Sequence, residues 1–166
     1  MHYLNCFFTY SIFGYLLETI IANLLNNDFN SGILIGTWTP IYGIGSIIII
    51  LISKYILKKI KNKYLRILLI FTSATIVLTL LEGIGGFLLE ELFNVTYWNY
   101  NNHKFNIGKY ISLFISLAWG FGSLIFVYFI HLKLNKYISL IPKWGTVILS
   151  LLFLLDIIIT CFIQLK

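Results

Sequence analysis

The stretch at residues 67–91, ILLIFTSATIVLTLLEGIGGFLLEE, decides how the rest of this chain is interpreted. It begins with an uncharged apolar run typical of a helix that crosses a bilayer. It then places Glu82, Gly86 and Glu90 within an arc of ~80° on one helix face. A carboxylate inside such a helix costs about 2.5–3.5 kcal/mol to insert. Glu82 therefore predicts either a functional site or a helix–helix contact in which it bonds a neighbouring Tyr or Ser.

The composition of the whole chain agrees with a membrane setting. Of the 166 residues, 59% are hydrophobic and only 11% are charged, whereas soluble domains carry about 25% charged residues. The apolar runs are long and do not alternate, which excludes a transmembrane barrel. We therefore predict an all-α integral membrane protein, a bundle of about five transmembrane helices that forms a single polytopic domain over residues 1–166.

The predicted spans are 3–25, 33–51, 67–89, 110–132 and 145–165. Each has at least ~19 residues, enough to cross a hydrocarbon core of ~30 Å. Six of the twelve Lys and Arg residues lie in the loop 52–66 and three in the loop 133–144, while three fall on the other side. Positive charge is enriched in cytoplasmic loops, so the N-terminus is predicted inside and the C-terminus outside. The net charge of +6 thus indicates the lipid bilayer as partner and no nucleic acid.

Several classes of site find no support in the sequence. Cys6 and Cys161 are predicted near opposite membrane faces and are not expected to pair. His2, His103 and His131 lack the spacing of metal ligands, so no metal site and no cofactor is predicted. The first apolar segment has neither a basic leading region nor a cleavage site, so we expect a retained helix. No phosphate-binding loop G-x-x-x-x-G-K-[ST] occurs, and use of ATP would require another chain.

Residues that are uncommon inside membrane helices are predicted to lie at a similar depth of the bilayer. Glu18 and Glu82 each lie about 15 residues into a span that rises from the inside, or ~22 Å from the inner face. Spans 33–51 and 110–132 place further polar and aromatic residues ~9–14 Å below the outer face. This convergence predicts one outward-facing ligand pocket. The residues predicted to bind the ligand are Glu18, Tyr42, Glu82, Ser116 and Trp119.

The loop 90–109 is dense in aromatic and amide side chains. Aromatic residues at a membrane interface usually form an anchoring belt, although this composition also suits a lid over a polar or sugar-like ligand. The residues predicted at the lid or entrance are Glu90, Trp98, Tyr100 and Asn106.

Small residues and one proline mark further sites of interest. Pro40, followed by Gly43 and Gly45, predicts a kink in the second span, of a kind that forms binding sites in transporters. A plain packing kink is an equally good interpretation. The Ser and Gly residues of the first and fourth spans, which include Ser11, Gly14, Ser112, Ser116 and Gly120, are typical of close helix packing.

The ordered motifs resemble one bacterial membrane family. Residues 11–18, SIFGYLLE, are similar to its S-x-x-G-[WY]-x-x-E opening. Further matches are Gly32 with Gly36, the run from Pro40 to Gly45, Glu82 with Gly86 and Glu90, Trp98 with Tyr100, Asn106 with Gly108, and Ser116 with Trp119 and Gly120. Over residues 11–120 the chain resembles the CmpB-like proteins, named as type IV ABC-transporter components. It departs from them at Ser31, where a basic residue is usual, at Thr37, where a proline is usual, and at Asn99, where an acid is usual.

The resemblance implies a transport-associated membrane component. We therefore predict a small bacterial transporter or transporter subunit of the inner membrane, in which the carboxylate pocket binds a polar or cationic small ligand. A separate ATPase or another membrane subunit would be its partner, and a homo-oligomer is compatible with the sequence. One alternative is an intramembrane enzyme in which paired Glu residues act as acid and base on a lipid or lipid-linked head group. The other is a structural subunit of a larger complex.

Overall fold

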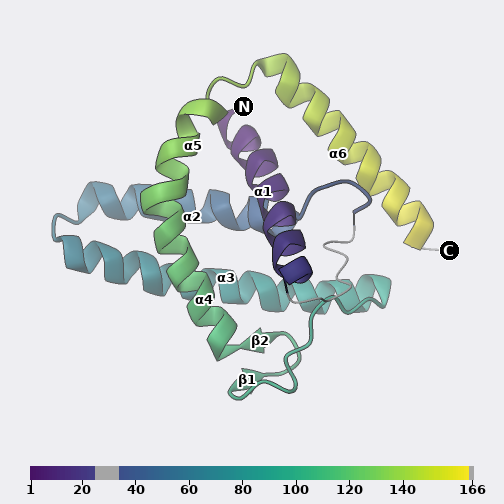
Figure 1. Cartoon of the computed structure of the whole chain (residues 1–166), viewed down its shortest axis with the longest axis horizontal. Helices are drawn as coiled ribbons and strands as arrows, with labels where there is room; N and C mark the ends of the chain where they lie inside the picture. Colours follow the sequence, from purple (N-terminus) through teal and green to yellow (C-terminus); the bar gives the residue numbers. More distant parts are fainter. Residues whose placement is uncertain (25–33, 165–166) are drawn as a thin grey trace. The chain divides into compact units, whose positions relative to one another are not determined.

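The computed structural model describes residues 1–24 and 34–164, which form a series of helices with one short β-hairpin between α3 and α4 (Figure 1). Five helical segments are long and apolar enough to cross a membrane, which confirms the predicted five-helix class. The predicted loop 26–32 with Gly32, and the span ends at 25, 33 and 165, lie outside the described residues. The elements are α1 (His2–Leu24), α2 (Pro40–Lys59), α3 (Lys63–Phe93), β1 (Asn106–Ile107), β2 (Ile111–Ser112), α4 (Leu113–Ile125), the π-helical η1 (Phe126–Ile130), α5 (His131–Ile138) and α6 (Lys143–Gln164).

The second span differs from the kinked helix expected around Pro40. Helix α2 begins at Pro40, and residues 34–39 precede it without helical structure. Proline suits the first helical position because the N–H it lacks has no partner there in any helix. Gly43 serves close packing, since a Cβ at that position would lie 2.2 Å from Ser11 Oγ.

The chain divides into two compact units, Met1–Ile47 with Asn135–Lys166, and Ile48–Leu134. In the first unit, Asn5 of α1 joins two segments from the C-terminal part of the chain. Its Oδ1 accepts a hydrogen bond from Thr146 Oγ1 at 2.5 Å, and its Nδ2 donates to Ile138 O at 3.5 Å. Edge-on contacts between aromatic rings, with centroids 5.2–6.1 Å apart, complete the packing of this unit, and their members are Phe7, Phe8, Trp38 and Phe153.

In the second unit, α3 is the central element. The side chain of Asn62 caps its start by accepting from Tyr64 N and Leu65 N, at 2.9 and 3.1 Å. The helix ends at Asn94, which adopts a left-handed φ of 53°. With 31 residues, α3 is ~46 Å long, which exceeds the ~30 Å hydrocarbon core. The core of the unit is formed by Ile49, Ile70, Ala74 and Val127.

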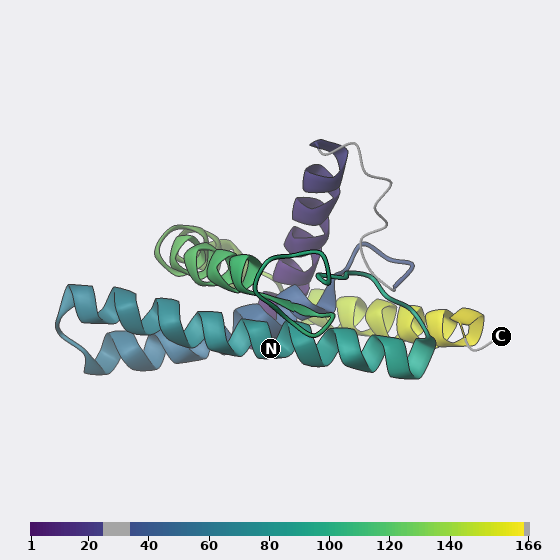
Figure 2. The ribbon, with the colours of Figure 1, turned by 90° about the horizontal axis from the view of Figure 1, so that it is seen from below.

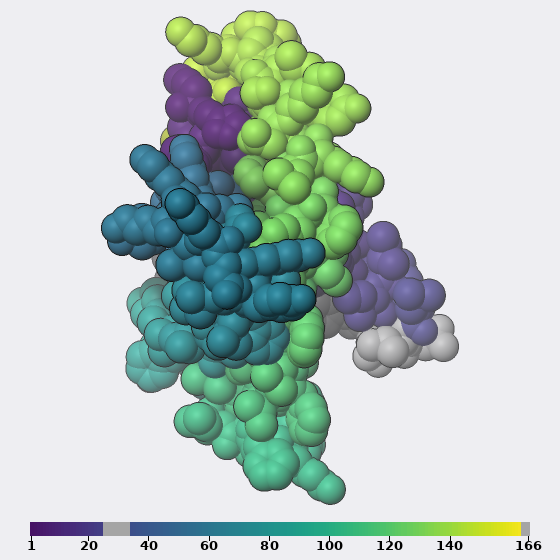
Figure 3. All heavy atoms as spheres, turned by 90° about the vertical axis from the view of Figure 1, so that its left-hand side faces the viewer, coloured from purple at the N-terminus to yellow at the C-terminus, as the bar shows by residue number. Residues whose placement is uncertain are grey.

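The segment 52–66, which includes the turn between α2 and α3, carries half of the Lys and Arg residues of the chain. Its basic side chains are exposed except for the half-buried Arg66. Figure 3 looks onto this turn, and shows side chains that extend outward from it. The exposed Lys residues thus lie at one end of two long apolar helices, and the cytoplasmic location of this end stays a prediction.

Two glycines of α4 provide a matched pair for testing how α4 packs on α3. A Cβ on Gly120 would lie 2.3 Å from Thr75 Oγ1 and 2.7 Å from Phe71 Cε2, whereas a Cβ on Gly122 would meet nothing within 4 Å. Gly120→Ala is therefore expected to lower the free energy of unfolding by about 1–3 kcal/mol. Gly122→Ala is expected to raise it by up to about 1 kcal/mol, since alanine favours the helix. Unfolding in detergent measures both, and equal effects would contradict this packing.

Candidate functional site

Glu82 of α3 forms the centre of a buried polar cluster in the second unit. Its side chain is only 5% exposed. Tyr100 OH donates to Glu82 Oε1 at 2.8 Å, and Trp119 Nε1 donates to Glu82 Oε2 at 3.0 Å. Three separate elements, α3, the loop after it and α4, therefore contribute one side chain each to this cluster.

The path of the chain after α3 brings Tyr100 to Glu82. Helix α3 continues for 11 residues beyond Glu82, or ~16 Å, before it ends at Phe93. The loop that follows must return by a similar distance for Tyr100 to reach this carboxylate. Figures 1 and 2 show the loop and the β1–β2 hairpin lying back along α3.

Helix α4 places two further predicted residues near the cluster. Trp119 is presented by the packing of α4 on α3, in which Gly120 permits close approach. Ser116, one turn earlier on α4, is 6% exposed. The structure thus joins Glu82 to Trp119 directly, and it buries Ser116 on the neighbouring turn of the same helix.

Glycine positions on α3 let the hairpin approach the helix. A Cβ on Gly86 would lie 2.4 Å from Tyr110 Cδ1, and one on Gly83 would lie 2.9 Å from Ile111 Cδ1. The loose glycine cluster after Glu82 is therefore the surface on which the hairpin packs.

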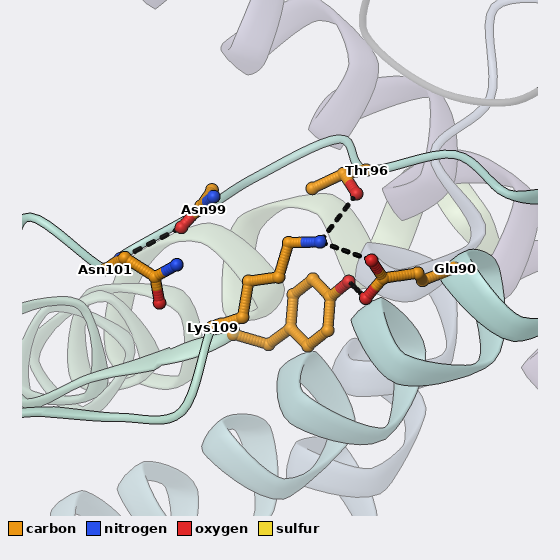
Figure 4. A network of polar contacts seen from close by, with 6 residues as sticks. Glu90, Thr96, Asn99, Asn101 and Lys109 are labelled. Carbon is orange, nitrogen blue, oxygen red and sulfur yellow. Dashed lines mark hydrogen bonds and ion pairs between the residues drawn. The ribbon is translucent and has the colours of Figure 1, made fainter.

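A second cluster of polar contacts fastens the loop to the end of α3 (Figure 4). Lys109 Nζ forms an ion pair with Glu90 Oε1 and donates to Thr96 Oγ1 at 3.1 Å. Tyr110 OH donates to Glu90 Oε2. The Trp98 ring lies edge-on to Tyr110, with centroids 6.2 Å apart. Glu90 and Trp98, both predicted at the entrance, thus lie in one fastening cluster.

Asn106, the remaining predicted lid residue, has a local role in the hairpin. Its Nδ2 donates to Gly108 O at 2.9 Å, and Gly108 has a left-handed φ of 60°. This contact shapes the turn between β1 and β2, which pair antiparallel with Ile107 opposite Ile111.

The ion pair of Lys109 predicts a loss of loop attachment at alkaline pH. The hydrogen bond that Lys109 donates to Glu90 raises the pKa of Lys109 above its usual 10.5. While Glu90 is ionised, the stabilisation by this pair is therefore fully present up to about pH 10.5, and it is lost as the pH rises through the raised pKa of Lys109. We expect the emission of Trp98 to change over that range, and Lys109→Gln to abolish the change. Trp98→Phe identifies which part of the signal comes from this residue, and an unchanged transition in Lys109→Gln would contradict the prediction.

The structure also shows a His–Ser contact that the sequence reasoning missed. His103 Nδ1 lies 3.0 Å from Ser112 Oγ, and the His103 ring lies 4.9 Å from that of Tyr100. Ser112 is fully buried at the start of α4. The contact therefore joins the loop to the start of α4.

In the first unit, Glu18 of α1 lies next to Tyr42 of α2, with which it shares a side-chain hydrogen bond. The Tyr42 ring packs against Gly14, where a Cβ would lie 2.3 Å from Tyr42 Cγ. Backbone N–H of Thr39 donates to Ser11 O at 3.1 Å on the same face of α1. The predicted face of Ser11, Gly14 and Glu18 is therefore a contact surface for the start of α2.

Asp156 of α6 is the buried carboxylate that sequence reasoning did not assign to any site. It is 8% exposed and accepts from the backbone N–H groups of Ile35 and Gly36 at 3.0 and 2.8 Å. Trp38 Nε1 donates to its Oδ2 at 2.7 Å, and Thr160 Oγ1 donates to its Oδ1 at 3.2 Å. Asp156 thus holds the non-helical segment before α2. No sequence pattern indicated this, because two of the donors are backbone groups.

Comparison with known proteins identifies the family of this chain. Among residues 1–24 and 34–164, no group of three His, Cys, Asp or Glu side chains is arranged to hold a metal ion. No curated protein and no solved structure matches the chain. A sequence model of the family ABC_trans_CmpB, described as "Putative ABC-transporter type IV", matches residues 5–164, nearly the whole length. The chain belongs to this CmpB family of ABC-transporter type IV membrane proteins.

Proposed function

We propose that this multi-pass membrane protein is a bacterial transporter or transporter subunit in which Glu82 binds a polar, cationic small ligand. The observation that carries the proposal is the charge balance at Glu82. Its two hydrogen-bond donors, Tyr100 and Trp119, are both neutral. A buried carboxylate is costly without a compensating positive charge. A cationic ligand would supply that charge.

Two other carboxylates among the described residues, Glu90 and Asp156, have more favourable partners than Glu82. Glu90 has Lys109 as its ion-pair partner. Asp156 has four donors, two of which are backbone N–H groups that require an acceptor. Glu90 thus has a cation beside it and Asp156 has twice as many donors as Glu82, so Glu82 has the fewest partners of these three carboxylates.

The side chains around Glu82 suit an organic cation. Trp and Tyr rings attract ammonium groups through cation–π interactions of about 0.5–2 kcal/mol. Trp119 and Tyr100 are both within hydrogen-bond distance of the carboxylate. An amine could exchange its water shell for the carboxylate and an aromatic face.

Glu18 is proposed as a second ligand carboxylate, with Tyr42 as its neighbour. The loop that carries Tyr100 would act as the lid, fastened at Glu90. Since no phosphate-binding loop for ATP occurs in the chain, a separate ATPase is the proposed partner for active transport. The proposed location is the bacterial inner membrane.

Counterflow in liposomes tests this function without an ATPase. Liposomes preloaded with methylammonium are diluted into radiolabelled methylammonium, with tetramethylammonium, sodium and glucose as competing probes. The wild type is expected to accumulate label, and Glu82→Gln and Glu18→Gln to lose it. Glu91→Gln, an exposed carboxylate on the same helix, is the matched control and should retain it. Equal accumulation in all variants, or none in the wild type, would overturn the proposal.

A further inference from the structure

An open groove runs between α3 and the β1–β2 hairpin, apart from the Glu82 cluster. Its volume is about 330 Å³, within the ~300–1,000 Å³ typical of ligand clefts. Its walls are apolar except for Lys109. They are formed by Leu80, Gly83, Ile84, Phe87 and Leu88 of α3, and by residues 107–111 of the hairpin.

The depth of the groove places it beside lipid. The part of α3 that lines it lies 13–21 residues beyond the predicted start of the span at residue 67, or ~20–32 Å along the helix. In a hydrocarbon core of ~30 Å this is the acyl-chain region of the leaflet next to the hairpin. Ile84 and Phe87 are 55% and 57% exposed in the protein alone, so bilayer components can reach both.

The hairpin adds features that suit a charged lipid. Phe105 and Ile107 are 71% and 73% exposed, although they lie outside the membrane-spanning helices. Lys104 is exposed beside Phe105. Apolar side chains next to an exposed Lys are typical of segments that lie at an anionic membrane surface.

We propose that the groove binds one acyl chain of an anionic phospholipid, whose head group contacts Lys104. One observation and two expectations favour a lipid over a protein segment. The groove is open along α3. The predicted span puts it at acyl-chain depth, and the charge of the exposed Lys104 would complement a phosphate. Because Lys109 forms an ion pair with Glu90, Lys104 is the basic residue that we expect to contact the head group. The site is independent of the ligand proposed for Glu82.

Native mass spectrometry of the full-length protein, titrated with phosphatidylglycerol, tests the proposal. Ile84→Trp would fill the groove and is expected to weaken lipid binding by about tenfold or more. Ile76→Trp is the matched control on the same helix. Ile76 is 60% exposed but does not line the groove, so its effect should stay within about twofold. Lys104→Gln should reduce the preference for phosphatidylglycerol over phosphatidylcholine.

A nitroxide at Ile107→Cys, with Cys6 and Cys161 replaced by Ala, provides a second measurement in bilayers. We expect this nitroxide to be highly accessible to oxygen, which concentrates in the bilayer, and poorly accessible to a water-soluble nickel chelate. Equal phosphatidylglycerol binding by Ile84→Trp and Ile76→Trp would overturn the proposal. So would a dimer that Ile84→Trp abolishes, because a second copy would then occupy the groove. A nitroxide accessible mainly to the nickel chelate would overturn the lipid contact of the hairpin.

Discussion

Replacing Asp156 with Ala is expected to lower the free energy of unfolding by at least about 3 kcal/mol. The substitution leaves four donors without their acceptor, which are Trp38 Nε1 and Thr160 Oγ1 in buried contacts and the backbone N–H groups of Ile35 and Gly36 in half-buried ones. Each buried donor left without a partner costs about 1–3 kcal/mol. The substitution also removes the cost of about 2.5–3.5 kcal/mol of placing a carboxylate in the membrane. This cost is present in both the folded and the unfolded membrane-inserted protein, so it largely cancels in the free energy of unfolding. The lost hydrogen bonds therefore determine that Asp156→Ala lowers the free energy of unfolding.

Two companion substitutions separate this account from a general effect of mutating α6. Gly36→Ala should destabilise the same segment, since its Cβ would lie 2.1 Å from Trp38 Nε1 and 2.6 Å from Asp156 Oδ2. Ser150→Ala removes only a contact with Thr146 O on the preceding turn, and should change stability by less than about 0.5 kcal/mol. Unfolding of the purified protein in mixed micelles measures all three. A similar effect for Asp156→Ala and Ser150→Ala would contradict the role assigned to Asp156.

Tyr100→Phe is expected to release the loop from α3 and raise its rate of proteolysis by about tenfold or more. A hydrogen bond to a charged group is worth about 1.5–3 kcal/mol, and every 1.4 kcal/mol corresponds to a factor of ten. The bond lost is the one from Tyr100 OH to Glu82 Oε1. The Lys109–Glu90 pair would still hold the base of the loop, so the rest of the protein should keep its stability.

Tyr97→Phe is the matched control for the loop, because it makes the same chemical change at a residue that does not bond Glu82. Its cleavage rate should equal that of the wild type. Limited proteolysis at low protease concentration, read by the mass of the fragments, measures the rate at the loop itself. Equal rates for the two variants would show that the bond to Glu82 does not fasten the loop.

The helices were predictable because length and apolarity are local properties of the sequence. Each predicted span overlaps one long helix, and the basic turn after Lys59 separates α2 from α3 as expected. The start of α2 was misplaced because the residues before Pro40 are also apolar. A hydropathy pattern cannot register that Asp156 of α6 holds these residues in a non-helical conformation.

The candidate site was predictable in part. The cost of a carboxylate in a membrane helix singled out Glu82, and the depth of Trp119 in the fourth span assigned this residue to the same site. Their direct contact depends on how α4 crosses α3, which the sequence pattern does not specify. The bond from Tyr100 depends on a loop that returns along its own helix, and the contact of His103 with Ser112 depends on the same return.

Equilibrium binding of methylammonium and tetramethylammonium tests the central claim, that Glu82 is a ligand carboxylate. Titration calorimetry on the protein in nanodiscs would compare the wild type with Glu82→Gln and with Glu91→Gln. We expect the wild type and Glu91→Gln to bind one of the cations, and Glu82→Gln to bind it at least about tenfold more weakly while remaining folded. Binding that Glu82→Gln leaves unchanged, or a wild type that binds neither cation, would contradict the claim.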